Sequence, residues 1–401
     1  MWRLNNRDSQ MVICAVMVML ASNVKALAQP PDNAALLYYQ AFLQYEEPNE
    51  TLEMMLIDFR KGAIVSNKVI AQYIERNRHV IDRAVTAAGI SKCDWGYDYS
   101  QGIMDMTMPK LPPIRNIALL LAVEARWLAE QGNYTTALDR CVTLRMIALH
   151  AFDRTLTWYI FGSQINRIAN ETTQDVLGLM PGNADDLNRL KSRLTQTEER
   201  FPSLVPYFTR EARMWVATMQ KDKVQPLVDL FGDLYEGPLG SDLSKRMFER
   251  IRKGDDTFFE RSRDYYLNAM STVVGTLESG LTYTQICTKL DGLVEQWNQE
   301  AKDNPDAIFT ALFFPPVKRT YQVMIKRQTH VNALKTAIDL YIVKTRTGQL
   351  PDTLPADSPP DLFSDKSFAF AKTAEGFILR CQGKEDPKDD KVHEYQFKAA
   401  H

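Results

Sequence analysis

The chain has 401 residues, of which 45% are hydrophobic and 24% charged, and its formal net charge is −2 at pH 7. This composition is that of a folded globular protein and excludes an intrinsically disordered chain. Because the charge is nearly balanced and the basic residues are scattered, the charge pattern does not predict binding to nucleic acid or to an anionic membrane surface.

Residues 1–28 have the pattern of an export signal. Arg3 and Arg7 precede the apolar run from Met11 to Ala21, and Ala26-Leu27-Ala28 offers the small residues that a signal peptidase recognises. This run is shorter than the roughly 20 residues of a membrane-spanning helix. We therefore expect cleavage before Gln29, with a retained N-terminal anchor as the alternative. The mature protein is then periplasmic or extracellular, without an integral membrane span.

Residues 29–310 are expected to form a helical body. Asn33 can cap the first helix, a second helix is expected over 50–61, and a third begins after Ser66 and stops at Gly89. Pro112-Pro113 suits the start of the next helix, since the first turn lacks amide partners anyway. Further helices are expected at about 114–130, 134–152, 155–179, 184–200, 203–222, 240–253, 255–277 and 281–303.

The helix at 155–179 and the next one are divided by Met180-Pro181-Gly182-Asn183, a stop-and-restart signal that makes 180–183 a candidate hinge. Asp185 and Asp186 follow it and are expected in the first helical turn, where negative charge is favourable. Short connections favour antiparallel neighbours. We therefore predict a mainly α protein, either a multi-helix bundle or an irregular α-superhelix.

One helical pair has a recognisable turn. Ala122, the Gly132-Asn133-Tyr134 turn and Ala137-Leu138 resemble the centre of a tetratricopeptide hairpin. In that hairpin the glycine permits a tight turn and the alanine permits close helix contact. A repeat array needs several copies of its period, and the spacing does not recur. A generic helical pair explains the pattern equally well.

Residues 311–401 are expected to form a separate module. Pro315-Pro316 precedes a long helix that ends at Thr347-Gly348. Alternating apolar and polar residues then predict a small antiparallel sheet with strands at 367–370, 377–380 and 394–397.

Four cysteines follow the signal: Cys93, Cys141, Cys287 and Cys381. An oxidising compartment allows three pairings among them, and the sequence does not choose one. The first pairing to test joins Cys287 to Cys381, because it would tie the terminal module to the helical body. The alternative, clearest for Cys141 on an apolar helical face, is a buried thiol. No CxxC spacing of a zinc or redox site is present.

No catalytic, cofactor-binding or metal-binding residue is assigned from the sequence. It contains no HExxH, GxSxG, Walker A or GxGxxG motif. Adjacent acidic residues do not face each other on a helix, so they predict no acid–base pair. His150, near a helix end, is expected to complement the C-terminal helix dipole. The remaining internal histidines share no metal-ligand spacing: His79, His330 and His393.

Several stretches carry a resemblance: Asp32 to Tyr39, Cys93-Asp94-Trp95, Thr347 to Pro351, Asp361-Leu362-Phe363 and Gly376 to Leu379. They resemble a family of exported bacterial proteins without characterised activity, over most of the mature chain. The resemblance implies an extracytoplasmic location and a helical body, and it implies no reaction.

The long helix, the Thr-Gly-x-x-Pro turn at Thr347 to Pro351 and the small sheet also resemble the soluble domain of type II secretion pseudopilins. The N-terminus lacks their processing motif, and Asp365 stands where their loop often has glycine. A pilus-building role is therefore not expected. The resemblance offers a calcium site, which needs six to eight oxygens, and the alternative is a solvated loop. The candidate ligands are Glu385, Asp386, Asp389 and Asp390.

Two functions of different classes follow. The first is a non-enzymatic extracytoplasmic protein that binds a partner protein of the cell envelope. The second is a hydrolase or small-ligand-binding protein whose site is assembled from distant helices. A buried pocket with several convergent polar groups would favour the second function.

Overall fold

The computed structural model describes residues 31–97, 112–225 and 241–399. The expected export signal at 1–28 and the breaks expected at Pro226 and at 237–240 lie outside these residues. The described elements are α2 (Ala34–Gln44), α3 (Glu50–Arg60), α4 (Lys68–Arg76), α5 (Arg78–Ala88), α6 (Pro112–Glu130), α7 (Tyr134–Ala151), α8 (Leu156–Leu179), α9 (Ala184–Glu199), α10 (Val205–Thr218), α12 (Ser241–Lys253), α13 (Asp256–Leu277), α14 (Tyr283–Glu300), η1 (Pro305–Ala307), α15 (Ile308–Phe313), α16 (Val317–Thr347), β1 (Ala369–Thr373), β2 (Gly376–Lys384) and β3 (Val392–Lys398).

The predicted fold class is confirmed: the described chain is mainly helical, with a long C-terminal helix and a small antiparallel sheet. The local signals place the helix ends well. Asn33 caps α2 by accepting a hydrogen bond from the Ala35 amide, and α6 begins at Pro112. The break at 180–183 is present, and Asp185 and Asp186 lie in the first turn of α9. None of the described helices combines the length and apolar composition needed to cross a bilayer.

One predicted helix is wrong. The segment from Ser66 to Gly89 forms two helices, α4 and α5, which meet at Asn77. The Asn77 side chain is fully buried and bonds to backbone groups: its amide donates to the carbonyls of Tyr73 and Glu46, and its oxygen accepts from the Glu46 amide. An asparagine that satisfies backbone groups in this way competes with the helix, which explains the break.

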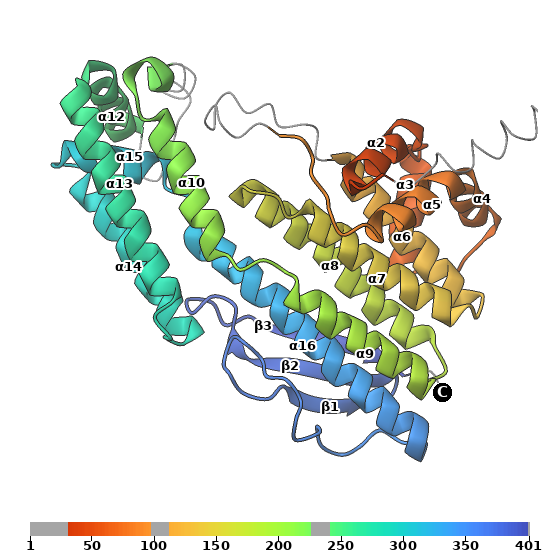
Figure 1. Ribbon diagram of the computed structural model, residues 1–401. Helices are drawn as coiled ribbons and strands as arrows, with labels where there is room; N and C mark the ends of the chain where they lie inside the picture. The colour runs from red at the N-terminus through yellow and green to blue at the C-terminus, as the bar shows by residue number, and fades with distance from the viewer. Residues whose placement is uncertain (1–30, 98–111, 226–240, 400–401) are drawn as a thin grey trace, which may run out of the picture.

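The helices α2–α5 form a cap over one end of α6–α8 (Figure 1). Two segments singled out in the sequence meet in this cap. The side chain of Asn33 exchanges hydrogen bonds with the backbone of Asp94, at 2.8 and 2.9 Å. Trp95 stacks on Tyr38, with 5.6 Å between ring centroids, and donates from its indole nitrogen to the His150 carbonyl. The aromatic residues thus fix the loop onto α2 and the end of α7.

The α6–α7 pair is a helical hairpin, as expected, and α8 packs on both of its helices. The turn residue Gly132 has a φ of +76°, a conformation that side-chain-bearing residues rarely adopt. This explains why a glycine is needed at the turn between the two helices.

The sheet is a β1-β2-β3 meander that lies against α16 (Figure 1). Its buried face carries Phe377 and Leu379 from β2 and Tyr395 and Phe397 from β3. At Gly376 a Cβ atom would lie 2.0 Å from the Phe397 carbonyl oxygen, so the close pairing of β2 and β3 requires glycine there. The three predicted strands are therefore confirmed, each longer than expected or shifted by a few residues.

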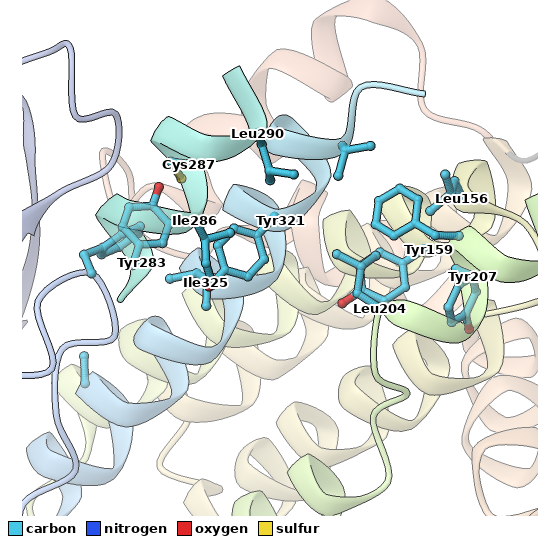
Figure 2. Close-up of a cluster of buried hydrophobic side chains, with 14 of the residues drawn as sticks. Leu156, Tyr159, Leu204, Tyr207, Tyr283, Ile286, Cys287, Leu290, Tyr321 and Ile325 are labelled. Atoms are coloured by element: carbon cyan, nitrogen blue, oxygen red, sulfur yellow. The ribbon is translucent and has the colours of Figure 1, made fainter. Parts of the chain in front are cut away.

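The helices α10 and α12–α15 project from the rest of the molecule as an arm, at the left of Figure 1. Figure 2 shows how α16 joins this arm to the body: Tyr321 and Ile325 of α16 lie between side chains of α14 and those of α8 and its neighbours. Tyr283 of α14 stacks on Tyr321, with ring centroids 5.8 Å apart. The module after residue 311 thus shares one hydrophobic core with the arm and with α6–α9. A second core lies between α2–α5 and α6–α8.

The cysteines differ from the disulfide expectation. Cys93, Cys141, Cys287 and Cys381 are all free thiols, so the structure contains the alternative that the sequence left open and not the pairing of Cys287 with Cys381. The last three are buried in apolar cores, where cysteine packs as a small hydrophobic side chain. Burial raises the pKa of the Cys141 thiol to about 12, so this sulfur stays protonated.

Candidate functional site

A cleft of about 1240 Å³ lies between α8 and the N-terminal half of α16. The end of α3, the start of α6, α14, the segment from Thr310 to Pro316 and the β2–β3 connection complete its walls. Both long helices contribute residues spaced by three and four, which places them on one helical face. From α8 these are Gln164, Arg167, Ile168, Glu171 and Gln174, and from α16 they are Arg319, Val323, Arg327 and His330.

The charge that lines this cleft is positive. Seven described cationic side chains contribute to the walls: Arg60, Arg115, Arg167, Lys318, Arg319, Lys326 and Arg327. The carboxylates there each have a basic partner: Glu171 with Arg167 (3.8 Å), Glu385 with Lys326 (3.3 Å), Asp386 with Lys318 (3.1 Å) and Glu394 with Arg380 (2.6 Å).

Three arginines of the cleft have no direct polar partner among the described residues. Arg60, Arg115 and Arg319 make no hydrogen bond or ion pair with any residue that the structure describes, and they come from α3, α6 and α16. Burial is the main cause that lowers the pKa of Arg60, and the charges of Glu171 and Asp175 oppose this shift only in part. The cleft therefore favours an anionic occupant electrostatically.

The floor of the cleft holds buried donors without partners. Asn170 and Thr310 are each 1% exposed, and the Asn170 Nδ2 and Thr310 Oγ1 atoms have no hydrogen-bond partner within the described residues. The same holds for Arg327 Nε and the Tyr395 hydroxyl. A buried polar group without a partner costs about 1–3 kcal/mol. These four atoms are themselves buried, so a ligand in the cleft as it stands does not contact them, and they report a polar layer beneath the cleft surface.

A buried ion-pair triad supports the floor. Arg145 of α7 and Arg327 of α16 both donate to Glu198 at the end of α9, at 2.8 and 2.6 Å. Both guanidinium groups also lie over the Phe201 ring, and Arg145 donates to the Asn170 oxygen at 2.7 Å. This last bond turns the Asn170 amide nitrogen away from Arg145. The triad therefore orients two of the floor groups.

His330 forms part of the same floor. Its Nε2 atom lies 3.0 Å from Gln174 Oε1, and its ring stacks on Tyr395 with centroids 4.6 Å apart. Burial, together with the charge of Arg145, lowers the pKa of His330 to about 3. The imidazole is therefore neutral at pH 7 and contributes shape and hydrogen bonding rather than charge.

Apolar side chains also line the cleft. Trp297 of α14 packs on Phe314, with 4.6 Å between ring centroids, and Pro315 extends this surface. Val294, one helical turn before Trp297, lines the cleft and is 42% exposed. The cleft is thus lined by both cationic and apolar side chains.

The residues that were considered as site candidates from the sequence do not form one site in the structure. His150 lies at the end of α7 as expected, but it is buried beside Tyr38, with 2.9 Å between its Nδ1 atom and the tyrosine hydroxyl. Burial lowers its pKa to about 4, so it is neutral at pH 7. The expected charged interaction with the helix dipole is therefore wrong.

The acidic residues of the β2–β3 connection do not converge. Glu385 and Asp386 turn toward Lys326 and Lys318 at the rim of the cleft, whereas Asp390 pairs with Lys384. Within residues 31–97, 112–225 and 241–399, no group of three or more His, Cys, Asp or Glu side chains is arranged to hold a metal ion. The geometry gives the calcium candidate no support.

The cleft residues were missed by the sequence reasoning. Arg60, Arg115 and Arg319 lie on three elements far apart in the chain and form no local motif. The one usable signal was the mixed face of the last long helix, where charged residues recur beside Val323 at helical spacing. Searches of family models, curated proteins and solved structures found no match to this chain.

Proposed function

We propose that the protein is an extracytoplasmic binding protein for an anionic small ligand, which the cleft between α8 and α16 holds. The observation that carries this proposal is the excess of cationic side chains in the cleft, among them three arginines without a direct hydrogen-bond or ion-pair partner in the described part of the chain. A largely preformed concave site with a few convergent polar groups is the usual form of a small-ligand site. The export signal in the sequence supports the extracytoplasmic location.

The arginines give this proposal a direct test. Citrate, a compact trianion, is the probe, and its binding is measured by titration calorimetry. Arg319→Gln is expected to weaken binding about five- to tenfold, because an exposed charge contact contributes on the order of 1 kcal/mol. Raising the salt concentration from 0.05 to about 0.5 M should weaken wild-type binding further, since screening shortens the reach of the field.

Arg346→Gln is the matched control, because Arg346 is an exposed arginine on the same helix but does not line the cleft. It should leave the affinity for citrate unchanged. An equal loss of citrate affinity in Arg319→Gln and Arg346→Gln would show that the cleft is not an anion site. The absence of any heat with millimolar citrate would show the same.

A partner-binding role is a second candidate, favoured by the cap. Leu36, Tyr39 and Leu43 are 50%, 37% and 88% exposed, and their spacing places them on one stripe of α2. An unpartnered apolar stripe is typical of a protein-binding surface.

In-situ crosslinking of the tagged protein in its own envelope, followed by mass spectrometry, tests this role. Leu43→Asp is expected to remove a recurrent crosslinked partner, whereas Leu281→Asp, at an exposed leucine between α13 and α14, should retain it. If no partner is recovered from the wild-type envelope, the partner-binding role fails.

A further inference from the structure

The presence of both cationic and apolar side chains in the cleft narrows the class of ligand. A ligand that carries only charge would leave the exposed Val294 and the half-buried Phe314 and Val323 in contact with water. A purely apolar ligand would leave the three arginines without acceptors. Only a molecule with a charged group and an apolar part interacts favourably with both kinds of side chain.

The size of the cleft agrees with a ligand of this kind. The volume of about 1240 Å³ exceeds what a compact anion would fill, and sites for drug-sized ligands span about 300–1,000 Å³. Val294 and Trp297 share one face of α14, and Val323 of α16 lines the same cleft between Arg319 and Arg327. An extended hydrocarbon chain therefore has a surface to lie on beside the charged groups.

We infer that the ligand is an anionic amphiphile, with an acidic headgroup held by the arginines and with a hydrocarbon tail against Val294, Phe314 and Val323. This inference rests on the proposed anion-binding function. It adds the tail, which the anion proposal does not require. A carboxylate and a phosphate monoester are the two headgroups with this chemistry.

The tail is tested with octanoate, decanoate and dodecanoate, each below its micelle-forming concentration, against the full mature chain. Burial of a methylene tightens binding about fourfold, so each step of the series should lower Kd about tenfold or more. Dodecanol, which lacks the charge, should bind at least tenfold more weakly than dodecanoate. Dodecyl phosphate in place of dodecanoate identifies the headgroup, because the preferred anion binds more tightly.

The wall is tested with Val294→Gln, which is compatible with an exposed helical site. It should weaken dodecanoate binding three- to tenfold and leave citrate binding unchanged. Val65→Gln, at a valine that is 75% exposed and outside the cleft, is the matched control and should change neither.

Two results would overturn the inference and are distinguishable. If citrate binds with the expected dependence on Arg319 but Kd is the same for octanoate and dodecanoate, the ligand has no tail and the anion proposal stands. If neither citrate nor dodecanoate binds, both proposals fail. Binding of dodecanol as tight as that of dodecanoate would also exclude an anionic headgroup.

Discussion

Replacing Glu198 by glutamine is expected to lower the free energy of unfolding by about 3–5 kcal/mol, the cost of breaking a buried ion pair from one side. Glu198 accepts hydrogen bonds from both Arg145 and Arg327, whose side chains are 0% and 4% exposed. Without this carboxylate, two buried guanidinium groups repel each other with no anion between them. Burial already lowers the pKa of Arg145 to about 10, which shows how far its charge depends on this partner.

Urea denaturation of wild type and variant measures this loss. Glu199→Gln is the matched control: Glu199 is the next residue in the sequence, is exposed and has no hydrogen bond or ion pair with the described part of the chain. Its stability should stay within about 0.5 kcal/mol of wild type. A Glu198→Gln protein that unfolds at the wild-type urea concentration would mean that the triad does not depend on its shared anion.

Replacing Asp361 by asparagine is expected to cost about 3 kcal/mol, because hydrogen bonds to a charged acceptor contribute about 1.5–3 kcal/mol. Asp361 is fully buried before the sheet, and its Oδ1 atom accepts from the Phe363 amide at 2.9 Å. Its Oδ2 atom accepts from the amides of Gln382 and Gly383, at 2.8 and 2.9 Å. An amide group in this position turns a donor toward backbone donors in either orientation.

Two measurements check the Asp361→Asn prediction. Denaturation measures the loss in the free energy of unfolding. Asp357→Asn, at an exposed aspartate in the same loop, is the control. Mass spectrometry after thiol labelling measures the local loosening of the loop. The neighbouring Cys381 is 2% exposed and should react faster once the loop loosens. Unchanged stability together with unchanged Cys381 labelling would contradict the assigned role.

The same loop contains Asp365, which has a φ of +57°. This is the position at which the resembling pseudopilin loop often has glycine, and aspartate is among the few other residues that adopt this conformation readily. The departure noted in the sequence is therefore compatible with the turn. The resemblance to pseudopilins and the extracytoplasmic location both stay predictions.

The sequence by itself determined most of the helices and the strands. Caps such as Asn33 and Asn183, the proline pair before α6 and the alternation in β2 and β3 act within one turn or one strand pair, so the residues that decide them lie close together in the chain. The failure at Asn77 has the opposite cause. That side chain reaches back to the backbone of Glu46, a contact that no local window contains.

Only the tertiary structure decided the cleft. Arg60, Arg115 and Arg319 line one cleft because α6 and α16 both pack on α8 and α3 packs on α6, and their lack of a direct partner is visible only when every neighbour is placed. The state of the cysteines and the neutrality of His150 were decided in the same way, by burial. The sequence gives the chemical type of each side chain. The desolvation of that side chain and its partners depend on segments far away in the chain.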